Sequence, residues 1–189
     1  MARRWQVVLG LTAAAVVTAA PLVYSSHRTS YSRNFRVVEE GVLYRSGQLS
    51  PAGLDRIIRE RGIRTVVSLR APGRSDSWEE QFCMDRGLTH RRIEPQKWGE
   101  DEKGDVPADA VVKEFLKVME DRANYPVLVH CFAGIHRTGT MCAIFRMKYH
   151  GWPAERAINE MHQCGFEPED LIQDIEGYLR TYNPRDTSP

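Results

Sequence analysis

The sequence predicts an α/β sandwich in which helices flank a central, mainly parallel sheet. Short runs such as residues 65–69 and 126–130 are apolar almost throughout, which is typical of strands buried on both faces. Amphipathic helical segments alternate with these runs, and this alternation is typical of a parallel sheet covered by helices. The 189 residues, 42% hydrophobic and 27% charged, suit one globular domain.

Each element has a local signal. The runs at 35–38 and 42–45 flank a glycine turn and predict a hairpin. Ser50 and Pro51 form a helix start, and Gly62 ends that helix. The remaining predicted elements are a strand at 65–69, a helix from Ser77 to Gly87, a strand at 88–93, a polar loop at 94–106, a helix from Pro107 to about Arg122, a strand at 126–130, and helices at 138–149, 153–163 and 169–182.

The N-terminal residues have a different character. Trp5 to Tyr24 form an almost apolar stretch of about 20 residues behind Arg3 and Arg4, which predicts an N-terminal hydrophobic helix. We interpret residues 1–24 as a signal anchor that binds the membrane and places the domain outside the cytoplasm. A cleaved signal peptide, giving a secreted form, is the alternative. The predicted organisation then continues with a polar tether at 25–34, the domain at 35–182 and a flexible tail at 183–189.

The charge balance argues against nucleic acid as a partner. The formal charge is +1, and four arginines give residues 1–33 a charge of +4, which leaves −3 for the rest. The cysteines form no CxxC pair and no ligand spacing with histidine, so the sequence predicts no metal site. The sequence leaves open the oligomeric state and the disulfide state of Cys83, Cys142 and Cys164.

The chemistry is concentrated after the last buried strand, where residues 130–139 read HCFAGIHRTG. A strand, a tight loop and a helix start turn backbone N–H groups inward at the positive end of a helix, which makes a phosphate-sized anion cradle. Cys131 lies at its rim, where a thiol is expected to ionise near neutral pH. Arg137 can bind two phosphoryl oxygens through its planar guanidinium.

This pattern resembles the protein tyrosine phosphatase superfamily, whose members have Cys, five residues, Arg and then Ser or Thr. Residues 43–50 and 62–70 are similar to the opening of compact bacterial dual-specificity-like phosphatases. The resemblance implies a cysteine-phosphatase-type sandwich without a cofactor, which hydrolyses phosphate monoesters through a Cys131 phosphoenzyme. It also implies the site roles. Thr138 would donate a hydrogen bond to the Cys131 sulfur and His130 would order the loop, while the phosphate would be bound by Phe132, Ala133, Gly134, Ile135, His136 and Arg137.

The resemblance further implies a general acid in the loop at 94–106. We favour Asp101 and keep Asp105 as the alternative, because Asp105 is near Pro107 and can instead stabilise the N-terminus of the following helix. The third interpretation is that residues 100–105 are only a solvent-exposed run of charged side chains with no catalytic role. Of the cations near strand ends, Arg45 and Arg70 are interpreted as structural or rim residues, and only part of residues 90–92 can face the anion site because strand side chains alternate.

The expected substrates are phosphotyrosine or phosphoserine/threonine in a protein, or a small phosphate ester. Ile135 occupies a position where members that act on inositol phosphates commonly have Lys, which argues mildly against a highly phosphorylated inositol. The alternatives are a phosphatase of a phosphoinositide and, from another functional class, a catalytically weak phosphate-binding module.

Overall fold

The computed structural model describes residues 17–19, 32–73, 77–99, 101–102, 106–167 and 174–185. Their strands form one sheet with the order β1-β2-β5-β3-β4. The bounds are β1 (Arg36–Glu39), β2 (Leu43–Ser46), β3 (Thr65–Ser68), β4 (Thr89–Arg92) and β5 (Val127–His130). β1 and β2 form the predicted antiparallel hairpin, and the other pairs are parallel. The predicted mainly parallel sheet is confirmed.

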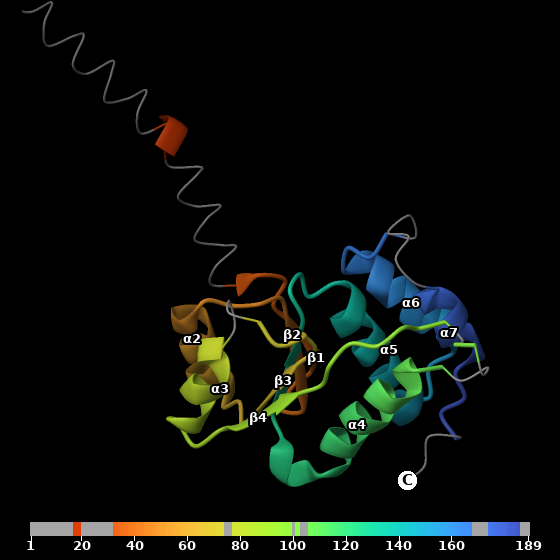
Figure 1. Cartoon of the computed structure of the whole chain (residues 1–189). Coiled ribbons are helices and arrows are strands. Elements are labelled where there is room, and N and C mark those ends of the chain that lie inside the picture. Colours follow the sequence, from red (N-terminus) through yellow and green to blue (C-terminus); the bar gives the residue numbers. More distant parts are fainter. Residues whose placement is uncertain are drawn as a thin grey trace, which may run out of the picture.

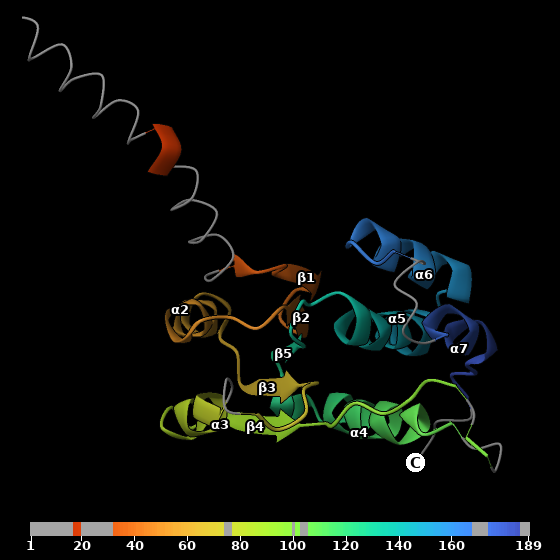
Figure 2. The same cartoon turned by 45° about the horizontal axis from the view of Figure 1, so that its top comes forward.

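Helices cover both faces of this sheet. In Figures 1 and 2, α2 and α3 lie on one face and α4 to α7 on the other. The alternation of strand residues supplies both interfaces: Tyr44, Val66 and Leu128 pack toward α2 and α3, whereas Val67 and Val129 join the larger core. The helix bounds are α2 (Pro51–Arg61), α3 (Ser77–Met84), α4 (Ala108–Glu120), α5 (His136–His150), α6 (Ala154–Gln163) and α7 (Ile175–Thr181).

Two helix starts bear directly on the predicted boundaries. The Ser50 hydroxyl accepts a hydrogen bond from the Gly53 N–H at 3.2 Å, so α2 begins at the predicted cap. α5 begins two residues earlier than predicted, because the Gly139 N–H already bonds to the Ile135 carbonyl at 2.8 Å. Residues 169–173 of the last predicted helix lie outside the described residues.

The predicted N-terminal hydrophobic helix also lies outside the described residues, apart from residues 17–19, which are helical. Within the described ranges, no helix combines the length and the apolar character that a membrane span requires. Residues 32–34, at the end of the predicted tether, are described and lie against the domain.

Candidate active site

The segment between β5 and α5, residues 131–135, forms a tight loop that we call the Cys131 loop. The Cys131 side chain is buried, and its sulfur accepts a hydrogen bond from the Gly134 N–H at 3.2 Å. The loop leads directly into the first turn of α5, where the unpaired N–H groups and the helix dipole favour negative charge. A nucleophilic sulfur and an anion-binding helix end therefore coincide.

The carbonyl groups of the Cys131 loop point away from this centre. The Phe132 oxygen accepts from the Gln48 N–H at 3.0 Å, and the Ala133 oxygen accepts from the Asn34 amide at 2.7 Å. The Gly134 oxygen accepts from the buried Arg45 guanidinium at 2.7 Å. In a planar trans peptide the N–H points opposite to the C=O, so the next N–H group in each case points inward. Three successive inward amides form the predicted anion cradle.

Gly134 allows the Cys131 loop to lie this close to the end of β2. Its φ of 75° lies in the left-handed region, and a Cβ there would be 2.4 Å from the Gly47 nitrogen and 2.6 Å from the Ser46 oxygen. These neighbours are backbone atoms, which cannot rotate away as a side chain can. The position therefore requires glycine.

Arg137 and Thr138 lie in the first turn of α5. The Arg137 Nη1 donates to the Leu69 carbonyl at 3.0 Å, which fixes the guanidinium beside the end of β3. Thr138 is fully buried, and its hydroxyl has no hydrogen-bond partner within the described part of the chain. The predicted bond from Thr138 to the Cys131 sulfur is thus not formed in this structure, where the Gly134 amide bonds to that sulfur instead.

The outer edge of the Cys131 loop carries an exposed aromatic ring between cations. Phe132 is 57% exposed, and the guanidinium carbons of Arg33 and Arg70 lie 4.1 Å and 5.5 Å from its ring centre. The Arg33 carbonyl also accepts from the Gly47 N–H at 2.7 Å. Residues 32–34 consequently pack against the loop rather than only connecting it to the N-terminal segment.

The following residues of the motif face the α6 side. Ile135 is half-buried against the larger core, and the His136 ring contacts the Phe166 ring edge-on at 5.5 Å. The His136 carbonyl accepts from the Thr140 hydroxyl at 2.9 Å, within the first turn of α5. These side chains support the loop from behind, so their contribution to phosphate binding rests on their backbone amides.

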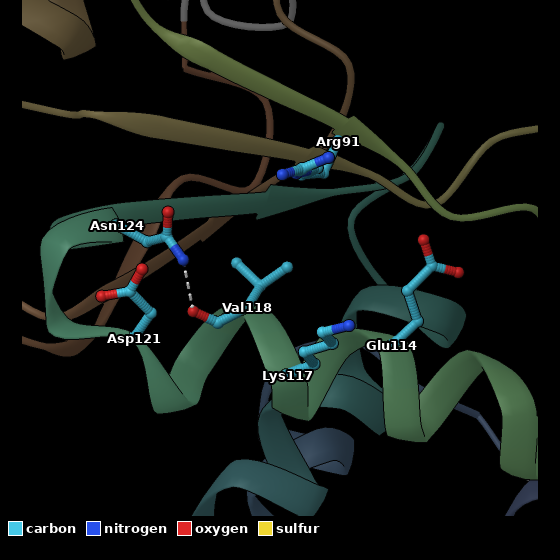
Figure 3. A pocket seen from close by; sticks show the side chains of 6 residues that line it. All are labelled: Arg91, Glu114, Lys117, Val118, Asp121 and Asn124. Atoms are coloured by element: carbon cyan, nitrogen blue, oxygen red, sulfur yellow. Dashed lines mark hydrogen bonds between the residues drawn. The ribbon is translucent and has the colours of Figure 1, made fainter.

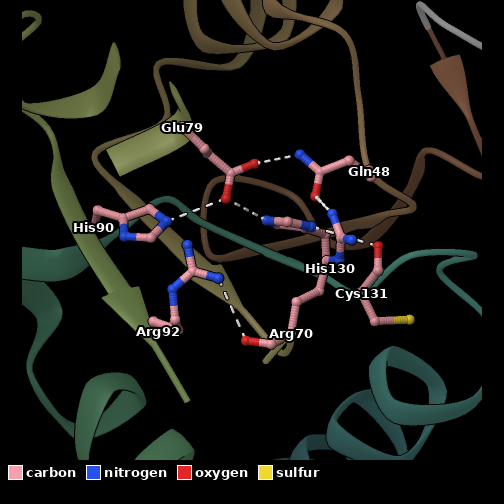
Figure 4. A network of polar contacts seen from close by, with 7 residues as sticks. All are labelled: Gln48, Arg70, Glu79, His90, Arg92, His130 and Cys131. Atoms are coloured by element: carbon pink, nitrogen blue, oxygen red, sulfur yellow. Dashed lines mark hydrogen bonds and ion pairs between the residues drawn. The ribbon is translucent and has the colours of Figure 1, made fainter. Parts of the chain in front are cut away.

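A polar network lies behind the loop on the α3 side (Figure 4). The buried carboxylate of Glu79 contacts His130, His90 and Gln48, and Gln48 in turn accepts from Arg70 at 2.8 Å. Burial by itself would raise the pKa of Glu79. The charge of His130 and the hydrogen bonds from His130, His90 and Gln48 outweigh burial and hold this pKa well below its usual range.

A separate cavity of about 500 Å³ lies between β4 and α4, on the other face of the sheet from this network (Figure 3). Basic and acidic side chains alternate around it, so it presents no consistent charge to a ligand. Its lining residues are Arg91, Glu114, Lys117, Val118, Asp121 and Asn124. The Cys131 loop remains the candidate site.

Comparison with known proteins identifies the family. The family described as DSP-PTPase phosphatase fused to NAD+ kinase matches residues 13–175, which include the Cys131 loop and every described strand. The chain belongs to this dual-specificity-like phosphatase family. The sequence motif and the loop geometry thus agree with the family match, and the resemblance to the protein tyrosine phosphatase superfamily is confirmed.

Individual relatives of the family support this assignment. The dual specificity protein phosphatase TpbA of Pseudomonas aeruginosa is 42% identical over 73 residues, which are 38% of this chain and only 34% of TpbA. The putative tyrosine-protein phosphatase OCA1 of Mycosarcoma maydis is 30% identical over 131 residues, covering 67% of this chain and 77% of the relative.

Solved structures agree at the level of the fold. The catalytic domain of the PP-IP phosphatase SIW14 from S. cerevisiae superposes with a TM-score of 0.66 at 19% identity, covering 82% of this chain and 89% of that chain. TpbA gives a TM-score of 0.64 at 23% identity, with coverage of 82% and 88%. At such identities the likeness concerns the fold alone.

The dual-specificity-like phosphatase family implies a general acid, whose predicted candidates belong to the segment between β4 and α4. Trp98 is buried against the Tyr178 ring of α7 at 5.1 Å, and Figures 1 and 2 show the segment between β4 and α4 passing beside α7. Asp101 is exposed in this segment, whereas Asp105 lies outside the described residues. The assignment of Asp101 or Asp105 as the acid stays a prediction.

The other cysteines differ from Cys131. All four thiols are free, and burial is the main cause that raises the pKa of Cys83 to about 12 and that of Cys142 to about 11. Cys83 and Cys142 are therefore poor nucleophiles. Cys164 is half-buried at the end of α6.

Several residues of this site were missed or underestimated by sequence reasoning. Glu79 lies in the first turn of the helix predicted from Ser77, where an acid is common and indicates no further role. Arg45 was interpreted as a structural or rim cation, and the structure assigns it the specific contact to the Gly134 carbonyl. The alternation of the strand at 90–92 was the available signal, since His90 contacts Glu79 while Arg91 faces α4.

Proposed function

We propose that the chain is a cysteine-dependent phosphatase that hydrolyses phosphate monoesters through a phosphoenzyme at Cys131. The observation that carries this proposal is the Gly134 N–H bond to the Cys131 sulfur, within a loop whose Phe132, Ala133 and Gly134 carbonyl groups are bonded outward. An anion bound by the inward amides would have its phosphorus next to the sulfur. Membership of the dual-specificity-like phosphatase family supports the same reaction.

The reaction proceeds in two displacements. The Cys131 thiolate forms an S–P bond while the ester P–O bond breaks, and the leaving oxygen takes a proton and departs as an alcohol. Water then attacks phosphorus, the S–P bond breaks, and inorganic phosphate and the thiolate are released. The loop amides and Arg137 bind the non-bridging oxygens and stabilise the charge that they carry in both transition states.

Phosphotyrosine or phosphoserine/threonine in a protein is the proposed substrate class. One TpbA structure is described as a complex with pTyr, whereas the Arabidopsis thaliana relative DSP3 is named an inositol diphosphatase. The exposed Phe132 ring at the mouth of the loop favours an aryl phosphate, and Ile135 adds no cation for further phosphates. A small phosphate ester or a phosphoinositide remains the alternative.

Turnover of p-nitrophenyl phosphate by the full chain tests the activity. Cys131→Ser is expected to lower the rate by about 10³-fold or more, because a hydroxyl is a far weaker nucleophile than a thiolate. Cys164→Ser, which removes a half-buried thiol at the end of α6, is the control and keeps the wild-type rate. Trapping of a phosphorylated Cys131 peptide in acid would identify the intermediate.

A catalytically weak phosphate-binding module is the second candidate, and it is favoured by the packing of Trp98, which precedes the acid candidates, against Tyr178 of α7. The same assay distinguishes the two. If the wild-type chain shows neither turnover nor a burst, while the Cys131→Ser variant binds inorganic phosphate, the protein is a binding module and the enzymatic proposal is wrong.

We further propose that the N-terminal apolar segment anchors the chain to the membrane with the phosphatase domain outside the cytoplasm. Arg3 and Arg4 before Trp5–Tyr24 support this orientation, since cationic flanks stay on the cytoplasmic side. A reporter fused after Pro189 should be active only outside the cytoplasm. Fractionation then separates the anchored form from a cleaved and secreted one.

A further inference from the structure

The sheet carries a row of polar residues at its carboxyl edge, on the face toward α3. The last residues of four neighbouring strands are in register: Ser46 with His130, His130 with Ser68, and Ser68 with Arg92. Residues in register on neighbouring strands share a face, so these four side chains form one line. Ser46, His130 and Ser68 are buried, and the row includes the residue directly before the nucleophile, because His130 precedes Cys131.

Glu79 of α3 packs against this row with its side chain 2% exposed. One carboxylate oxygen lies 2.9 Å from His130 Nε2 and 3.1 Å from His90 Nε2. The other accepts from the Gln48 amide at 2.6 Å. A carboxylate so buried is tolerated only when its oxygens are paired, and here three donors pair them.

Both nitrogens of the His130 ring face acceptors. Nε2 faces the Glu79 carboxylate, and Nδ1 lies 3.4 Å from the Cys131 carbonyl oxygen. A neutral imidazole donates from one nitrogen only, whereas an imidazolium donates from both. The ionised carboxylate balances the resulting positive charge. The geometry therefore suits a doubly protonated ring.

We propose that Glu79 is a positioning residue that holds the His130 ring as an imidazolium behind Cys131 and so favours the Cys131 thiolate. The inference rests on the proposed use of Cys131 as the nucleophile, and it adds a residue on a different helix to the site. A positive charge on the residue that precedes Cys131 favours the ionised form of its thiol, and the contacts of the ring with Glu79 and with the Cys131 carbonyl oxygen hold the ring in place.

The other charged groups around His130 are consistent with this role. From β4, His90 shares the Glu79 oxygen, and Arg92 donates to the Arg70 carbonyl at 3.4 Å. From the segment after β3, the Arg70 guanidinium binds Gln48 at 2.8 Å and so turns the Gln48 amide nitrogen toward Glu79. Among the seven residues drawn in Figure 4, Glu79 is the single acid. A neutral substitution at Glu79 would therefore remove the negative charge of this group.

From α3 itself, Cys83 is the other titratable neighbour. Burial raises the pKa of Cys83 to about 12, and the Glu79 charge adds to this shift. The Cys83 thiol is consequently protonated over the whole pH range of an alkylation experiment. It contributes no charge to His130 and does not compete with Cys131 for the reagent.

The test measures the rate of iodoacetamide alkylation of Cys131 against pH, by peptide mass spectrometry on the full chain. Glu79→Gln keeps the shape of the side chain and an acceptor oxygen but removes the charge. We expect the pH midpoint of alkylation to rise by about one unit, which is about a tenfold slower reaction well below that midpoint. Glu80→Gln, on the same helix and exposed, is the matched control and leaves the midpoint unchanged.

A second measurement needs no variant and is made on the wild-type chain. The 15N spectrum of the imidazole groups near pH 7 should show His130 protonated at both nitrogens. A neutral His130 ring, or a folded Glu79→Gln chain whose alkylation midpoint agrees with the wild-type value, would overturn the proposal. Because neither readout requires turnover, a chain that alkylates as expected but hydrolyses no ester would refute the proposed enzyme and leave the role of Glu79 intact.

Discussion

Gly134→Ala tests whether the Cys131 loop depends on close backbone packing. The new Cβ would lie 2.4 Å from the Gly47 nitrogen and 2.6 Å from the Ser46 oxygen, at a φ of 75°. A left-handed conformation costs a non-glycine residue about 1–2 kcal/mol, and forced overlap with fixed atoms costs about 1–3 kcal/mol more. We expect the free energy of unfolding to fall by about 2–5 kcal/mol.

The same substitution should also lower the rate of turnover. Displacement of Gly134 moves both the N–H that bonds to the Cys131 sulfur and the carbonyl that Arg45 holds. A shift of about 1 Å at reacting groups costs about 100-fold in rate. The assays are urea denaturation and the kcat/KM for p-nitrophenyl phosphate.

Gly151→Ala is the matched control. Its φ of 64° is similar to that of Gly134, but nothing lies within 4 Å of the Cβ position, and it ends α5 at the far side from the loop. Its free energy of unfolding should therefore fall only by the cost of the left-handed conformation, about 1–2 kcal/mol. Its turnover rate should equal that of the wild type. Equal losses of stability in the two variants, with unchanged turnover in Gly134→Ala, would refute the packing argument.

Two further predictions concern the rim of the site and the acid. Arg33→Gln removes the guanidinium over Phe132. The KM for p-nitrophenyl phosphate should then rise a few-fold at low salt, and its dependence on salt should become weaker. Arg36→Gln, at an exposed position of β1, is the control and should change neither the KM nor its salt dependence. An unchanged KM would show that Arg33 is only packing. Asp101→Asn should lower kcat by about 10²-fold or more if Asp101 is the acid, and a normal rate beside an impaired Asp105→Asn would transfer the role to Asp105.

The fold was predictable because its signals are local. The β-branched run at 65–69 and the cap formed by Ser50 and Pro51 depend on few neighbours, and the corresponding elements are present. The Cys131 loop was predictable for the same reason, since its spacing is contained in ten residues. The bond predicted from Thr138 to the sulfur is not formed in this structure, where the Thr138 hydroxyl has no partner among the described residues and the amide of Gly134 bonds to the sulfur.

The partners of the loop were not predictable because they come from distant segments. Glu79 contacts His130 at a sequence separation of 51 residues, and Asn34 contacts Ala133 at a separation of 99. The pairing of β1, β2 and β5 brings Asn34 to the loop, and that of β3, β4 and β5 brings Glu79 to His130. No local pattern encodes these long-range pairings. For the same reason the last residues of the predicted tether turned out to contact the loop.

The Glu79 network also gives a prediction that separates stability from function. Glu79→Met leaves the buried His130 ring without its charged partner, and removing one member of a buried pair costs about 3–5 kcal/mol in the free energy of unfolding. The double variant Glu79→Met/His130→Phe has no unpaired charge and should regain most of this stability, measured by urea denaturation. Turnover should stay impaired, because the His130 ring lacks its carboxylate partner in the single variant and is absent from the double variant. A double variant that recovers stability and activity together would mean that the network serves only the fold, whereas one that is stable and slow would mean that this fold retains a buried ion pair for its chemistry.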